Sequence, residues 1–317
     1  MPDIDKLNGV AFATSVSKVD GVSKSSIGSI SGVSAPSSTT YFLDTYSGSS
    51  LAFSFRQLSG SATNCIEVTN DSGIAQDIGF SSGYLDTSAI STHCGSGSGR
   101  ISKWYDQSGN NRHSSQTSTS QMPLIFQSGI MLNVNVKASA RFDGGDRLVI
   151  ASNTVHTGSF YGTSVIMTSS SIPNGSILNQ DDSYNVPSTN RVRIAQYLRT
   201  GSANGGTARI VVFNTSGSNF ADNTASIGTN TQMQISSYAT SSGTIEVFVN
   251  SSSNGSSSYT GTLKTGSHEL AIGSNVHGST PGSYFNGSIQ EVILWDGDQS
   301  SDRSSIESDI DTYYSIP

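Results

Sequence analysis

The sequence predicts an all-β protein built as a β-sandwich, with a short C-terminal helix and an N-terminal arm of β-hairpin repeats. The first observation is composition: 65 Ser, 28 Thr, 21 Asn and 33 Gly make up nearly half of the 317 residues, and only 12% are charged. Coiled coils and helical bundles need Ala, Glu, Lys and Leu in quantity, so they are excluded. The second observation is that short β-branched and aromatic runs recur between Ser/Gly/Asn clusters, which is typical of a sandwich.

The third observation is a motif that occurs three times in residues 1–37, which predicts a docking arm ahead of a sandwich over residues 38–317. Each copy ends in Asn-Gly, Asp-Gly or Ser-Gly followed by Val, and such dipeptides favour the positive-φ turn of a two-residue hairpin. Hairpins this small cannot bury their own apolar side, so we expect them to stack on another surface. The alternative is a flexible leader with accidental turn dipeptides. The expected docking residues are Leu7, Val10, Val19, Val22, Ile30 and Val33.

The strands of the sandwich are predicted from alternation and from β-branched runs. In the segment 244–250, Ile245, Val247 and Val249 share one side, and a long polar hairpin tip is expected to follow over 250–255. The run 289–295 is apolar almost throughout, as in a central strand covered on both faces. Expected strands are Leu51–Leu58, Cys65–Thr69, Ser164–Met167, Ala208–Phe213, Gln232–Tyr238, Thr244–Asn250 and Ser288–Asp296. Helical spacing predicts helices over Ser82–Thr92 and Ser301–Tyr314.

The charge pattern excludes two classes of partner. The net charge is −7 and the Lys and Arg residues are scattered singly, so no basic stripe for nucleic acid is present. No apolar run approaches the roughly 18 residues of a membrane span, and residues 1–5 lack the features of a signal peptide, so we expect neither membrane insertion nor export. A hydroxyl-rich surface made in a host cytoplasm without a signal peptide fits a virion component released by lysis. Cys65 and Cys94 are expected to be two small thiols or one late-formed bridge.

Several stretches carry a resemblance to a known family. The run 104–110, Trp-Tyr-Asp-Gln-Ser-Gly-Asn, together with Phe53–Leu58 and Cys65–Val68, resembles the catalytic domain of fungal-type α-L-arabinofuranosidase B. The stretches 140–146, 246–250 and 284–289 resemble laminin-G-like, concanavalin-A-like jelly rolls. Similar sequences and similar N-terminal repeats occur in phage structural proteins. The resemblance therefore implies a concanavalin-A-like (laminin-G-like) jelly roll on a phage virion protein.

The chemistry of that family requires two carboxylates across the scissile bond. The family's acid/base aspartate follows a Leu-Gly-Ile-Gly-Gly run, and the matching stretch 270–275 ends in Asn275. An amide cannot donate and recover a proton in that role. The family's nucleophile is a Glu, and no Glu lies between Glu67 and Glu246, a region whose only acidic pair is Asp181 and Asp182. We therefore expect no catalytic residues and no enzyme activity.

Two further sites remain as expectations. Asn275, His277 and Tyr284 belong to a Gly-rich stretch that related jelly rolls use near sugar, and polar edges beside an aromatic ring suit a glycan. With Asp181 and Asp182 they form the candidate glycan site, whose alternative is an ordinary surface loop. Asp143 and Asp146 are weak candidates for Ca²⁺. The stronger alternative is a turn in which these aspartates accept hydrogen bonds from backbone amides, so no cofactor is expected.

The function expected from these observations is a phage virion-surface structural protein, a capsid decoration, head fibre or tail fibre docked through its N-terminal repeats. Its partners would be other capsid or tail proteins, host-surface glycans held weakly, and further copies of the chain, with a trimer favoured by analogy to phage fibres. Two alternatives come from other classes: a carbohydrate-binding adhesin module, and an arabinofuranosidase-like glycoside hydrolase.

Overall fold

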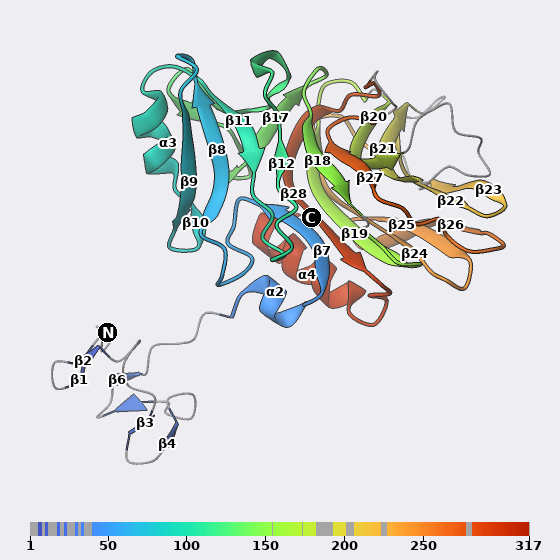
Figure 1. The fold of residues 1–317 in the computed structure, drawn as a ribbon, viewed down its shortest axis with the longest axis horizontal. Coiled ribbons are helices and arrows are strands. Elements are labelled where there is room, and N and C mark those ends of the chain that lie inside the picture. Colours follow the sequence, from blue (N-terminus) through green and yellow to red (C-terminus); the bar gives the residue numbers. More distant parts are fainter. Residues whose placement is uncertain are drawn as a thin grey trace.

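The computed structural model describes residues 40–153, 155–172, 174–181, 193–200, 206–222, 227–276 and 281–316, together with six short strands nearer the N-terminus (Figure 1). The six strands are β1 (Lys6–Leu7), β2 (Val10–Ala11), β3 (Lys18–Val19), β4 (Val22–Ser23), β5 (Ser29–Ile30) and β6 (Val33–Ser34). They pair as three separate antiparallel hairpins, β1 with β2, β3 with β4 and β5 with β6. The hairpin repeats expected from the Asn-Gly, Asp-Gly and Ser-Gly dipeptides are therefore confirmed.

The chain then forms a sandwich that strands dominate. Its first part contains α2 (Phe42–Thr45), β7 (Ser49–Ser54), β8 (Asn64–Asn70), β9 (Ala75–Ser81), β10 (Tyr84–Leu85), α3 (Thr87–Cys94), β11 (Gly99–Trp104), β12 (Ser114–Ser115), the 3₁₀-helix η2 (Thr119–Gln121), β13 (Leu124–Gln127), β14 (Ile130–Met131), β15 (Asn133–Val134), β16 (Lys137–Ala138), β17 (Ala140–Asp143) and β18 (Leu148–Asn153). Its second part contains β19 (Phe160–Thr168), β20 (Gly175–Asp181), β21 (Arg193–Thr200), β22 (Gly206–Asn214), β23 (Gly217–Asp222), β24 (Gln232–Ala239), β25 (Thr244–Val249), β26 (Ser252–Ser258), β27 (His268–Ile272), β28 (Asn286–Asp296) and α4 (Arg303–Tyr314).

Antiparallel pairing arranges these strands in two layers. One layer runs β23-β22-β21-β20-β27-β18-β12-β11-β8-β9-β10. The other runs β26-β25-β24-β19-β28-β7, and β17 and β13 connect its central strand β28 back to β11. Strands distant in sequence thus lie side by side, as expected of a jelly roll (Figure 1).

The main core fills the space between the two layers. Ile245 and Val247 of β25 are buried there and Val249 packs against it, which confirms the alternation predicted from the sequence. β28 is buried on both faces: Val292 and Leu294 belong to the main core, whereas Ile293 and Trp295 belong to a second cluster beneath α2 and α4. Because each face of β28 packs against apolar neighbours, its nearly continuous apolar sequence has a direct structural cause.

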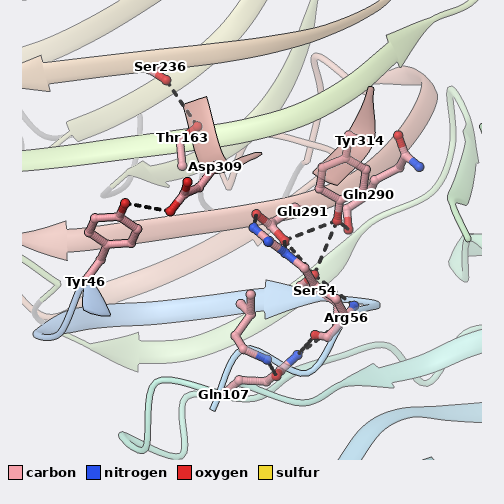
Figure 2. Close-up of polar contacts among 11 residues, drawn as sticks. Tyr46, Ser54, Arg56, Gln107, Thr163, Ser236, Gln290, Glu291, Asp309 and Tyr314 are labelled. Atoms are coloured by element: carbon pink, nitrogen blue, oxygen red, sulfur yellow. Dashed lines mark hydrogen bonds and ion pairs between the residues drawn. The ribbon is translucent and has the colours of Figure 1, made fainter. Parts of the chain in front are cut away.

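A buried ion pair beneath α4 links β28 to the segment that follows β7 (Figure 2). Arg56, just after β7, donates two hydrogen bonds of 2.8 Å to the carboxylate of Glu291 in β28. Glu291 is fully buried and also accepts hydrogen bonds from the hydroxyls of Ser54 and Tyr314. Burial alone would lower the pKa of Arg56, but the Glu291 carboxylate raises it above its ordinary value. This carboxylate is saturated and closed to solvent, so it serves structure rather than proton transfer.

Four predicted elements differ from the structure, and one is the strand expected over Leu51–Leu58, which ends at Ser54. The helix expected over Ser82–Thr92 begins only at Thr87, because Tyr84 and Leu85 pair with β9 and Asp86 then accepts hydrogen bonds from the first turn of α3. The long polar tip expected over 250–255 is a two-residue turn, since Asn250 and Ser251 adopt φ of +47° and +62° and the following serines pair with β25 as β26. The C-terminal helix, expected over Ser301–Tyr314, begins at Arg303. Both cysteines are free thiols.

Candidate functional site

The outer face of the β23-β22-β21-β20-β27 layer carries the side chains that point to a binding function. Antiparallel partners share a face, so the register places Asn179, Ala195 and Val211 in one row across β20, β21 and β22. Ala195, Val211 and Phe213 form a small apolar cluster on this face, and Tyr197 packs against it. The opposite face of the same strands belongs to the main core. We call this surface the outer face of the β20–β23 sheet.

A cation, a carboxylate and two aromatic rings meet at one end of this face. Arg209 of β22 makes a bidentate ion pair with Asp222 of β23 and donates a 3.2 Å hydrogen bond to the hydroxyl of Tyr197. Its guanidinium carbon lies 4.1 Å from the ring centroid of Phe220, so the guanidinium group covers one face of that ring. Phe220 is nevertheless 51% exposed. The hydrogen bond with Asp222 holds the pKa of Arg209 above its ordinary value, so this cation stays charged.

Sequence reasoning missed this cluster, although a signal for it exists. A two-residue turn, Thr215 and Ser216, joins β22 to β23, and the resulting register sets Arg209 opposite Asp222 and Val211 opposite Phe220. Treating residues 206–222 as one hairpin would therefore have placed the cation and carboxylate together.

Two carboxylates lie on the neighbouring strands β20 and β27 at the other end of the outer face. β20 and β27 pair Leu178 with Ile272, Asn179 with Ala271 and Gln180 with Leu270. Continued by one residue, this register would set Asp181 beside Glu269, and on its other side Asp181 pairs with Arg193 of β21. Opposed residues on antiparallel strands have Cβ atoms about 4.5–5.5 Å apart. Asp181 is only 3% exposed, whereas Glu269 is exposed. Glu269 had no place in the predicted site, because only pairing brings it to Asp181.

The predicted glycan loop lies beside β20. Asn275 follows β27, and its carboxamide oxygen accepts a 2.6 Å hydrogen bond from the Gly282 amide while its nitrogen lies 3.4 Å from the Ser283 hydroxyl. Both groups of this side chain therefore help to hold the loop in shape. The Val276 amide donates to the side-chain oxygen of Asn179, two residues before Asp181. The loop and the carboxylate end of β20 are thus brought together.

The other predicted residues fall in different places. Tyr284 lies beside the start of β20, where its carbonyl approaches Gly175, and its hydroxyl is 3.5 Å from the Gln121 amide. Asp181 is six residues further along β20, about 20 Å away along an extended strand, so these two residues do not share one site. Asp182 and His277 lie outside the described residues, as do the side chains of all six predicted docking residues.

Asp143 and Asp146 adopt the turn geometry that was the alternative to a metal site. The Asp146 carboxylate accepts a 2.9 Å hydrogen bond from the Asp143 amide, and Asp143 accepts one of the same length from Gly145. Burial raises the pKa of Asp146 to about 7. Within the described residues, no group of three or more His, Cys, Asp or Glu side chains is placed to hold a metal ion.

Comparison with known proteins shows likeness in fold. No family model and no curated protein matches the sequence. Three crystal structures of arabinofuranosidases match with 16% identity over 83% of this chain and 62% of theirs. They are a GH54 α-L-arabinofuranosidase mutant soaked with 4-nitrophenyl α-L-arabinofuranoside (TM-score 0.61), an arabinofuranosidase with arabinofuranosyl-α-1,2-xylobiose (0.59), and a GH54 enzyme soaked with a cyclic sulfate inhibitor (0.58).

These matches correct one expectation and support others. The jelly-roll fold and the resemblance to the arabinofuranosidase catalytic domain are confirmed. The expectation that the chain is not an enzyme is wrong as a conclusion, because these fold neighbours are glycoside hydrolases. That expectation depended on aligning single residues, such as Asn275, with the catalytic positions of the family. The chain spans about three-fifths of the length of these enzymes. No described helix is both long and apolar enough to cross a membrane.

Proposed function

We propose that this chain is a carbohydrate-active domain that binds arabinofuranosyl groups of a glycan on the outer face of the β20–β23 sheet. The observation that carries the proposal is the cluster of Arg209, Asp222, Tyr197 and Phe220. Sugars present apolar C–H faces and hydroxyl edges, so protein sites for them combine an aromatic ring with donors and acceptors fixed in position. The fold shared with arabinofuranosidases indicates the sugar class.

The geometry of the cluster supports stacking on Phe220. Arg209 covers one face of its ring at 4.1 Å, which leaves the other face for a ligand. The bidentate pair with Asp222 fixes the guanidinium, so little conformational entropy is lost when a sugar hydroxyl binds there. Ala195, Val211 and Phe213 lie beside this cluster but are only 0–6% exposed, so a ligand on this face would contact Phe220 rather than these buried side chains.

Titration calorimetry with arabinofuranosyl-α-1,2-xylobiose tests the proposal. Phe220→Ala should weaken binding by roughly three- to tenfold, because stacking on an aromatic ring contributes about 0.5–1.5 kcal/mol beyond its buried area. Ile74→Ala is the matched control, since Ile74 is an exposed apolar residue in the turn between β8 and β9. Equal loss in both variants, or no binding by the wild-type chain, would contradict the proposal.

A second candidate function, hydrolysis of arabinofuranosides, is favoured by the opposed pair of Asp181 and Glu269. Retaining glycosidases hold their two carboxyl groups about 5–5.5 Å apart, so that one acts as nucleophile and the other as acid and then base. Opposed residues on antiparallel strands have Cβ atoms about 4.5–5.5 Å apart, which allows their carboxyl groups to reach such a separation. One carboxylate of the pair is buried and the other exposed, and such unequal environments allow two carboxyl groups to take different roles.

Release of 4-nitrophenol from 4-nitrophenyl α-L-arabinofuranoside tests this second function. Asp181→Asn and Glu269→Gln should each remove turnover while leaving xylobiose-based binding at Phe220 intact. Glu67→Gln is the control, because Glu67 lies in β8 and hydrogen-bonds Ser102 at the far end of the same layer. Turnover that survives both substitutions would reject the pair. Absence of turnover in a wild-type chain that still binds would leave binding as the function.

For the N-terminal arm we retain the proposal of docking to a phage particle, with the sandwich displayed on the virion surface. Its support is that the apolar positions Leu7 and Val10, Val19 and Val22, and Ile30 and Val33 are cross-strand partners in their hairpins. Partners on the same face could pack on capsid or tail proteins, or on further copies in a trimer. A full-length variant with Val19→Asp and Ile30→Asp should lose co-sedimentation with particles that lack the protein. Unchanged co-sedimentation would argue against docking through the arm.

A further inference from the structure

A pocket lies beside β10, and Figure 1 shows β10 at the opposite end of the molecule from β23. It measures about 220 Å³, and segments distant in the sequence form its walls: β10, the β15–β16 hairpin and the last turn of α4. Its lining includes Tyr84, Leu85, Thr87, Asn133, Lys137 and Tyr313. We call it the Tyr84 pocket. None of these residues belongs to the outer face of the β20–β23 sheet.

Two aromatic rings and one cation dominate this pocket. The rings of Tyr84 and Tyr313 are nearly parallel, with an interplanar angle of 15° and centroids 6.3 Å apart. The Lys137 ammonium lies 4.1 Å from the Tyr313 centroid and 5.5 Å from that of Tyr84. Lys137 is the only charged lining residue, and no described carboxylate forms an ion pair with it. The pocket therefore presents an uncompensated positive charge beside aromatic surface.

The walls of the Tyr84 pocket are held rigidly from below. The Gln290 amide lies 3.2–3.3 Å from the carbonyls of Val134, Lys137 and Ala138, which fixes the β15–β16 hairpin on the sheet. Arg56, itself fixed by Glu291, stacks 4.5 Å from the Tyr313 centroid (Figure 2 shows the Arg56–Glu291–Tyr314 network). A pocket whose side chains are already ordered loses little entropy on binding a ligand.

The rim carries an unusual residue. Val136 is 91% exposed and has φ of +59°, and Asn135 before it has φ of +45°. A β-branched residue in the left-handed region is a genuine outlier, and Gly would fit this turn without strain. Val136 lines the pocket, so its exposed apolar side chain is available for contact with a ligand.

We propose that the Tyr84 pocket binds one carboxylate-bearing sugar ring, a uronic acid residue of a polysaccharide. The apolar face of the ring would lie on Tyr84 with Val136 at its edge, and the carboxylate would pair with the Lys137 ammonium. Asn133 and Thr87 supply the polar groups for ring hydroxyls. Charge decides between sugar classes here, because the lining offers a cation and no acidic side chain. This site is separate from the arabinofuranosyl site and does not depend on it.

The test compares a uronic acid trisaccharide with its carboxyl-reduced, neutral counterpart, titrated into the full chain at low and high salt. We expect the uronate to bind more tightly, with an advantage that shrinks as salt rises. Lys137→Met should reduce uronate affinity about tenfold and leave the neutral sugar nearly unchanged, as expected for one charge-assisted hydrogen bond. Tyr84→Ala should weaken both, and it should fold because Tyr84 is 53% exposed.

The controls separate this site from the first. Phe220→Ala should leave uronate binding unchanged, and Ile130→Ala serves as a matched exposed apolar substitution on β14. Equal affinity for the uronate and its reduced form would overturn the proposal, as would uronate binding that survives Lys137→Met or fails in Phe220→Ala. Circular dichroism and the thermal midpoint of each variant exclude unfolding as the cause of a loss.

Discussion

Replacing Arg56 by Met should destabilise the chain far more than replacing an exposed cation. The substitution leaves the Glu291 carboxylate fully buried, with only the hydroxyls of Ser54 and Tyr314 as donors. It removes two 2.8 Å hydrogen bonds to a charged group, each of which contributes about 1.5–3 kcal/mol. Loss of one partner from a buried ion pair costs about 3–5 kcal/mol in other proteins, so the two estimates agree.

A double-mutant cycle measures this coupling. Urea unfolding is followed through the fluorescence of Trp104 and Trp295, which are both fully buried. We expect Arg56→Met with Glu291→Gln to cost less than the sum of the single substitutions, by about 2 kcal/mol. Lys103→Met is the control, because its 3.9 Å pair with Glu67 is partly exposed and should contribute less than about 1 kcal/mol. Single costs that add, or an Arg56→Met cost below about 1 kcal/mol, would refute the reasoning.

Three further predictions concern stability. His156 is buried against Phe160, and burial lowers its pKa to about 4, so protonation of His156 opposes folding. Stability should therefore fall as the pH drops from about 6.5 towards 4. His156→Leu should flatten that part of the stability profile, measured by thermal melting. Val136→Gly should raise the unfolding free energy by about 1 kcal/mol, and a destabilised variant would contradict the strain at this turn. Gly273→Ala should lower the thermal midpoint by several degrees, because Gly273 has φ of +86° and a Cβ there would lie 2.4 Å from the Phe142 ring. An unchanged midpoint would show that the ring moves aside.

Local pattern was enough to predict seven strands of the sandwich, which are β7, β8, β19, β22, β24, β25 and β28. The alternation in 244–250 reflects one buried face, and the apolar run 289–295 reflects burial on both faces. The structure confirms both of these predicted strands. The helix expected over Ser82–Thr92 was wrong at its start, because Tyr84 and Leu85 pair with β9 and a long-range ladder overrides local spacing. The same limit applies to the turn at Asn250 and Ser251, where pairing rather than composition decides which serines form a strand.

The candidate sites were harder to predict because strand register forms them. Asp181 was chosen for its acidic neighbour in sequence, whereas strand pairing sets it opposite Arg193 of β21 and places β27, which carries Glu269, on its other side. Arg209 and Asp222 are 13 residues apart and meet only across a hairpin. The Tyr84 pocket draws on β10, β15–β16 and α4, so no segment of the sequence contains its pattern. Motif matching detects a site whose residues lie in one segment of the sequence. Each candidate site here combines residues from separate strands or helices.

The two outer faces of the sandwich explain why both proposed sites lie where they do. Beneath α4 and α2, the outer face of the β28 layer is closed by Trp295, Ile306 and Ile310, so it has no apolar surface to offer a ligand. The outer face of the β20–β23 sheet has no described helix over it, and its exposed ring is Phe220. Where α4 ends, its last turn leaves Tyr313 at the border of the closed face, and the β15–β16 hairpin adds Lys137 beside it. Both proposed sites thus lie where described helix cover is absent or ends.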